Sequence, residues 1–169
     1  MKILYYILLL LLPAFAEATE PHRGLTVTFI EPGHYTDVGL SGSNTDNIQR
    51  YVLDTLKDYL GYLADNYLPG KHTLAIKILD VDMAGAYEPW RGPMLYNTRI
   101  IRDIYPPRIK LHYVWKNEQG ELLAEEDEDL SDLAYLQLRD PGYINNDPLR
   151  YEKTLLKRWF EQRFKVPPK

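Results

Sequence analysis

The sequence predicts an α+β fold: a mainly antiparallel sheet with two helices packed on one face, in the order strand, helix, three strands, helix. Two observations predict it. Apolar residues recur every three or four positions over residues 46–68 and again after residue 147, which is typical of helices with one buried side. β-branched, alternating segments lie before and between them, as strands with one buried face require.

Residues 25–30 form the first expected strand, which Glu31-Pro32-Gly33 stops. A surface loop rich in Gly and Ser follows. The first helix begins near Asp46, with Ser43 or Thr45 as its cap, and Pro69-Gly70 ends it.

Residues 73–82 form the second expected strand, with Leu74, Ile76 and Ile78 on one face and Lys77 on the other. Residues 83–107 then make a long irregular connection that contains several prolines, with room for a short strand at residues 99–102.

Residues 108–116 and 121–129 predict a hairpin closed by a turn at residues 117–120. If Lys116 pairs with Glu121, Lys110 faces Asp127, Arg108 faces Asp129 and His112 faces Glu125, all on the solvent side. The seven acidic residues of 121–132 thereby become half of a cross-strand charge ladder. In this register Glu126 and Glu128 fall on the apolar side, so the strand is expected to end or bulge near them.

Asp147-Pro148 opens the final helix, as a cap followed by proline at the first helical position. Residues 148–169 carry seven basic side chains. They either balance the acidic hairpin within the fold or contact anionic lipid or an acidic partner.

Residues 1–16 predict a cleavable signal peptide: Lys2, an apolar run to Leu12, and small residues before cleavage after Ala16 or Ala18. The alternative, a membrane anchor, is disfavoured because ten apolar residues rise only about 15 Å as a helix, roughly half of a bilayer core. The expected organisation is a polar lead-in at 17–24, a single α+β domain at 25–166 and a tail at 167–169. The expected location is the periplasm, with no membrane span.

Composition narrows the expected partners. The chain has no cysteine, which argues against disulfides and against a lipid anchor attached through cysteine. Its net charge of −4 argues against nonspecific binding of nucleic acid. The four histidines are scattered without metal-ligand spacing, so no metal and no cofactor are expected.

Aromatic residues in the long connection predict a contact surface at Tyr87, Trp90, Arg91, Tyr96 and Tyr105, because these residue types dominate binding energy at interfaces. We add Tyr35 and Asp37 from the loop after the first strand. The alternative is that Trp90 folds back over the sheet.

Three carboxylates give a competing interpretation. Asp80 and Asp82 lie two apart on a strand, and Glu88 follows in the next loop. A pair of carboxylates at a suitable separation supplies the general acid and base of a glycosidase, and gathered carboxylates also bind hard cations. The plainer interpretation is that they solvate a strand end. No catalytic residue is assigned outside this alternative.

Several segments in this order resemble one family of exported proteins from Gram-negative bacteria, domain-of-unknown-function family 3016. The segments are residues 27–29 with 35–37, 79–85, 107–111, 130–133 with Tyr135, and 147–153 leading to Trp159-Phe160. The resemblance implies a periplasmic setting and supplies no activity, cofactor or catalytic residue. The order of elements is also similar to that of small envelope accessory proteins.

The sequence therefore predicts a soluble periplasmic protein that is not an enzyme and that binds an envelope protein or glycan. The alternative is a carboxylate-dependent hydrolase that acts on cell-wall glycan.

Overall fold

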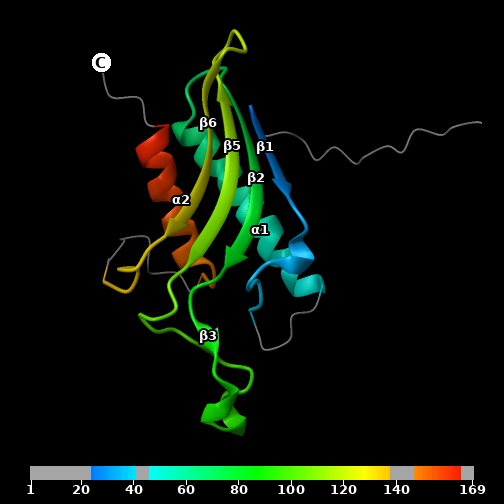
Figure 1. Ribbon diagram of the computed structural model, residues 1–169, viewed down its shortest axis with the longest axis vertical. Helices are drawn as coiled ribbons and strands as arrows, with labels where there is room; N and C mark the ends of the chain where they lie inside the picture. The colour runs from blue at the N-terminus through cyan, green and yellow to red at the C-terminus, as the bar shows by residue number, and fades with distance from the viewer. Residues whose placement is uncertain (1–23, 41–45, 138–146, 165–169) are drawn as a thin grey trace, which may run out of the picture.

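The computed structural model describes residues 24–40, 46–137 and 147–164. Within them, the main sheet has the strand order β1–β2–β5–β6 (Figure 1). Its strands are β1 (Leu25–Phe29), β2 (Thr73–Asp82), β5 (Arg108–Lys116) and β6 (Leu122–Ser131). Helices α1 (Asp46–Tyr67) and α2 (Arg150–Arg163) both cover one face, so the predicted α+β class is confirmed.

Several predictions fall outside the described residues. These are the signal peptide at 1–16, the lead-in at 17–23, the capping role of Ser43 or Thr45, and the tail at 167–169.

Strand pairing is antiparallel except at one edge. β1 runs parallel to β2, and Leu25 lies opposite Leu74. Helix α1 makes the crossover between these strands, which a parallel pair needs. β2 with β5 and β5 with β6 are antiparallel, as predicted.

The core lies between the sheet and the two helices. Leu74, Ile76 and Ile78 of β2 are each at most 2% exposed, as their shared face predicted. They belong to one buried cluster with β5 and both helices, which includes Ile109, Leu111, Tyr113, Val52, Leu56, Leu60, Leu63, Leu156, Trp159 and Phe160.

The predicted register of the β5–β6 hairpin is wrong by two residues. Lys110 lies opposite Asp129 and His112 opposite Asp127. In the turn, the Asn117 N–H donates to the Glu121 carbonyl at 3.0 Å, and Lys116 therefore pairs with Leu122 instead of Glu121. A bulge next to Trp115 then shifts the pairing by one further residue. A shift of two keeps every side chain on its predicted face. Arg108 still contacts Asp129 and His112 still contacts Glu125, although these residues are not directly opposite, whereas Lys110 lies 3.7 Å from Asp80.

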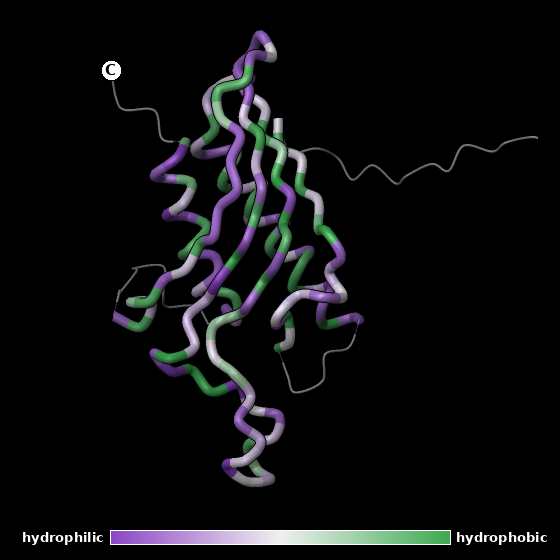
Figure 2. The backbone as a smooth tube through the Cα atoms, in the orientation of Figure 1, coloured by the Kyte–Doolittle hydropathy of each residue, from purple (hydrophilic) through white to green (hydrophobic). Residues whose placement is uncertain are grey.

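The expectation that β6 ends or bulges near Glu126 and Glu128 is also wrong. The strand continues to Ser131, and Figure 2 shows residues 125–129 as its hydrophilic stretch. Arg163 of α2 lies 2.6 Å from Glu128 and 3.4 Å from Glu126. Arg158 lies 2.6 Å from Asp132. For these two arginines, the interpretation that the last helix balances the acidic hairpin is confirmed.

The long connection between β2 and β5 contains a second, two-stranded sheet. Its strands are β3 (Ala86–Tyr87) and β4 (Arg99–Ile100), with two short 3₁₀ turns at Pro89–Arg91 and Pro93–Leu95 between them. We call residues 86–100 the ribbon and residues 89–98 its tip. The ribbon projects beyond the end of the main sheet, at the bottom of Figure 1.

No helix among the described residues combines the length and the apolar composition needed to cross a bilayer.

Candidate functional site

Arg99 fastens the root of the ribbon to the sheet. Its guanidinium donates to the Asp37 carboxylate at 2.5 Å and to the Gly39 carbonyl at 2.8 Å. It also donates to three successive carbonyls where the chain leaves β2, at 2.8–3.2 Å: those of Met83, Ala84 and Gly85. Arg99 is 10% exposed, so one buried cation ties together segments distant in sequence.

Glu88 forms a second anchor within the ribbon. Its side chain is 1% exposed and accepts from Arg102 at 2.9 Å and from the Tyr105 hydroxyl at 3.0 Å, and it also pairs with Arg91. Burial acts to raise the pKa of Glu88, but the bonds from Tyr105 and Arg102 and the charge of Arg91 outweigh it and hold the pKa below its usual value. The carboxylate therefore stays ionised and braces the ribbon.

The tip beyond these anchors is apolar and uncovered. Trp90 is 72% exposed, Met94 95% and Tyr96 51%. Arg91 is the only charged residue among residues 89–98. Trp90 does not fold back over the sheet, and the role of the tip in binding stays a prediction.

The remaining predicted contact residues lie behind the tip. Tyr35 is buried and its hydroxyl donates to the Ile78 carbonyl at 2.8 Å, while burial raises its pKa to about 12. Tyr87 is half-buried and donates to the Gly39 carbonyl at 3.2 Å. Tyr105 holds Glu88, and Asp37 holds Arg99. Tyr87, Tyr105 and Asp37 thus support the ribbon and Tyr35 belongs to the core. Trp90, Tyr96 and part of Arg91 face solvent.

A bulge in β2 decides where its two aspartates point. In a regular strand Asp80 and Asp82 would share the buried face of Ile78. The pairing with β5 shifts between Ile78 and Asp80, and Val81 becomes fully buried instead. The bulge thus moves both carboxylates to the outer face, where β-bulges commonly re-aim side chains.

The three predicted carboxylates do not gather into one site. Asp80 accepts from the Thr36 N–H at 2.8 Å and from its hydroxyl at 2.9 Å, and lies 3.7 Å from the Lys110 ammonium. Glu88 is held within the ribbon. Asp82 lines a cleft. Among the described residues, no group of three or more His, Cys, Asp or Glu side chains is placed to hold a metal ion.

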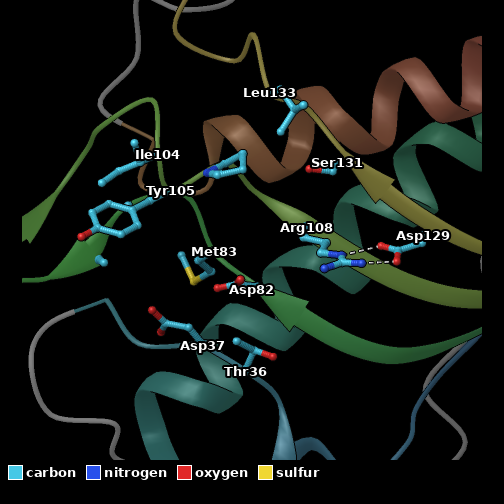
Figure 3. A pocket seen from close by; sticks show the side chains of 13 residues that line it. Thr36, Asp37, Asp82, Met83, Ile104, Tyr105, Arg108, Asp129, Ser131 and Leu133 are labelled. Atoms are coloured by element: carbon cyan, nitrogen blue, oxygen red, sulfur yellow. Dashed lines mark hydrogen bonds and ion pairs between the residues drawn. The ribbon is translucent and has the colours of Figure 1, made fainter.

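The cleft has a volume of about 630 Å³ and lies between the root of the ribbon and the nearby end of the sheet (Figure 3). Its polar lining includes Asp37, Asp82 and the Arg108–Asp129 ion pair. Its apolar lining includes Met83, Ile104, Tyr105, Pro106 and Leu133. Burial raises the pKa of Asp82, and the neighbouring charges of Asp37 and Asp80 raise it further. A carboxyl of raised pKa in a cleft is a feature of functional sites.

Sequence reasoning missed Glu152. This residue of α2 is 1% exposed, and its Oε1 accepts the Ala84 N–H at 2.7 Å, next to the carbonyl that Arg99 holds. Its Oε2 is buried without a hydrogen-bond partner. Burial raises the pKa of Glu152 to about 7. One signal was present, because Glu152 falls on the same side of the helix as the apolar Leu155, Leu156 and Trp159.

Comparisons with known proteins agree with the resemblance noted in the sequence. The model of a family described as "Protein of unknown function (DUF3016)" matches residues 24–162. The match covers the main sheet, the ribbon and nearly all of α2. Comparison with curated proteins gave no match, and neither did comparison with solved structures. The chain therefore belongs to DUF3016, a family of proteins of unknown function.

Proposed function

We propose that this chain is a protein of the periplasm without catalytic activity. We further propose that it binds another protein or a glycan of the cell envelope through the ribbon tip. One observation carries the proposal: Trp90, Met94 and Tyr96 are 72%, 95% and 51% exposed at the end of a braced ribbon. Aromatic anchors of this kind dominate interface energies once a partner covers them.

The anchoring of the ribbon supports a binding role. Ordering a mobile loop on association reduces affinity, and a loop that is fixed beforehand avoids that cost. Arg99 and Glu88 fix this one through partly buried ion pairs that leave the tip itself uncovered. The arrangement suits a surface that is presented in one geometry to a partner.

Photo-crosslinking tests the proposal. A photoreactive amino acid replaces Trp90 in cells, and a second strain carries it at Tyr62, an α1 aromatic with 58% exposure, as the matched control. We expect a discrete adduct from position 90 and none from position 62. Equal adducts at positions 90 and 62 would contradict the role of the tip. The absence of adducts both at position 90 and, in a further strain, at Met94 would also contradict it, provided that the protein is folded and exported.

The periplasmic location has a separate test. N-terminal sequencing of protein from the periplasmic fraction should begin after Ala16 or Ala18. An intact Met1 in that fraction would refute cleavage.

A hydrolase that acts on cell-wall glycan is the second candidate, favoured by the raised pKa of Asp82 in the cleft. A glycosidase also needs a second carboxylate near the first. The two other carboxylates that line the cleft, Asp37 and Asp129, are each paired with an arginine, which weakens the hydrolase proposal. Turnover of peptidoglycan fragments that Asp82→Asn abolishes would establish it. Absence of turnover by the folded protein would rule out the hydrolase.

A further inference from the structure

The cleft beside the ribbon has two chemically different ends. Ile104 and Leu133 lie at one end in Figure 3, and Asp82 and Asp37 lie at the other. Ile104 is 58% exposed and Leu133 78%. A ligand that covers these two side chains would remove apolar surface from water, the usual source of affinity in such pockets.

The charged groups of the cleft leave one carboxylate without a direct partner. Asp37 is paired with Arg99, and Asp129 takes two bonds from Arg108. In the described part of the chain, no hydrogen bond or ion pair is made by the Asp82 carboxylate. Its partial burial and the charges of Asp37 and Asp80 disfavour its ionised form, and the charges of Arg99 and Arg108 offset this only in part. A cation entering the cleft would relieve this repulsion.

The lining selects the kind of cation. Calcium and magnesium need several oxygen ligands converging on one point, and the described residues offer no group of three or more metal-ligating side chains. An organic ammonium needs a single carboxylate, and its aliphatic stem needs an apolar wall. The cleft supplies both, from Asp82 at one end to Ile104 and Leu133 at the other.

We propose that the cleft binds an alkyl ammonium group, with Asp82 as the counter-ion and Ile104 and Leu133 covering the aliphatic stem. Two sources share this chemistry: a free alkyl amine or diamine, and the lysine side chain of a peptide. The site is distinct from the ribbon tip and does not rest on its proposed role.

An NMR titration of the purified chain with small probes tests the proposal. The probes are n-butylamine, 1,4-diaminobutane and N-acetyl-lysine amide, with 1-butanol and butyrate as neutral and anionic counterparts of the amine. Saturable shifts at the cleft residues with the cationic probes only are the expected result. Tighter binding of N-acetyl-lysine amide than of the amines assigns the site to peptides, and the reverse order assigns it to free amines. Equal binding of 1-butanol, or no saturable shift with any amine, overturns the proposal.

Matched variants separate Asp82 from the general acidity of this face. Asp82→Asn should weaken butylamine binding about tenfold, because the counter-ion is lost while the shape is kept. Asp127→Asn removes one negative charge from the same sheet face, where its side chain is 81% exposed, and should leave binding unchanged. An equal loss in both variants would reduce the effect to diffuse electrostatics and refute a site.

A second pair of variants keeps the test informative if Asp82→Asn does not fold. Leu133→Arg places a cation at the mouth of the cleft and should block the amines. Leu122→Arg makes the same change beside the hairpin turn, at a residue that is 56% exposed, and should not affect binding. Amine binding that is unaffected by Leu133→Arg contradicts the proposed position of the stem. Trp90→Ala should leave amine binding intact, so failure of the tip hypothesis and failure of the cleft hypothesis are distinguishable.

Discussion

Replacement of Glu152 by glutamine should make the protein more stable at neutral and alkaline pH. The side chain is 1% exposed, and one of its oxygens has no hydrogen-bond partner. Burial raises its pKa from an ordinary 4.5 to about 7. The ionised carboxylate is therefore the disfavoured form in the folded state, and an amide mimics the protonated form because its carbonyl still accepts the Ala84 N–H.

The direction and the magnitude of this change in stability follow from proton linkage. Between pH 4.5 and about 7, the unfolded chain has released the Glu152 proton while the folded chain retains it. The free energy of unfolding therefore falls as pH rises through this window, and the loss is complete above the folded pKa. At 1.36 kcal/mol per pKa unit, a shift of this size corresponds to about 3 kcal/mol.

Urea unfolding of the wild type and of Glu152→Gln, measured from about pH 4 to about pH 9, checks this prediction. The two proteins should differ by less than about 1 kcal/mol at the acid end, and the variant should be more stable by about 3 kcal/mol above pH 7. The difference between the two profiles cancels every other titrating group. Glu118→Gln, at an exposed position in the hairpin turn, should follow the wild type. Parallel profiles for Glu152→Gln and wild type would refute the reasoning.

Three further changes test the anchors of the fold. Arg99→Lys should lower the free energy of unfolding by about 3 kcal/mol, because an ammonium cannot make all the hydrogen bonds of the guanidinium and the buried carbonyls lose their donor. A loss below about 1 kcal/mol in urea unfolding would contradict the role of Arg99 as the anchor of the ribbon. Gly85→Ala should cost about 1–3 kcal/mol, since φ is +83° and a Cβ would lie 2.8 Å from a carbonyl of β4, whereas Gly33→Ala meets nothing within 4 Å and should be neutral. A double-mutant cycle of Arg108→Ala and Asp129→Ala should give a coupling of about 0.5–1 kcal/mol, because both side chains are about half exposed, and no coupling would contradict the ion pair between them.

The sequence predicted the element order because periodicity reports local burial, which each segment carries by itself. It did not predict the β-bulge beside Leu79. By alternation alone, Asp80 and Asp82 would continue the buried face of Ile78, and only the pairing with β5 shows that they do not. The hairpin register failed for a similar reason, since the bulge at Trp115 depends on contacts across the strands and not on the residues of the turn.

The candidate site was predicted in part. Exposed aromatic residues at the tip follow from residue type, so Trp90 and Tyr96 were identifiable. Tyr35 has the same residue type but lies in the core, because its neighbours in space come from β2. Arg99 and Glu152 were missed as anchors, since a charged residue shows its burial only through partners distant in the chain.

The ribbon leaves and returns to the sheet at adjacent points, because Asp82 and Arg108 are opposite each other in the pairing of β2 with β5. The intervening residues, 83–107, are in effect an insertion at the turn of a hairpin, and chain length there is decoupled from strand register. The tip could lengthen, shorten or change its side chains without repacking the helices against the sheet.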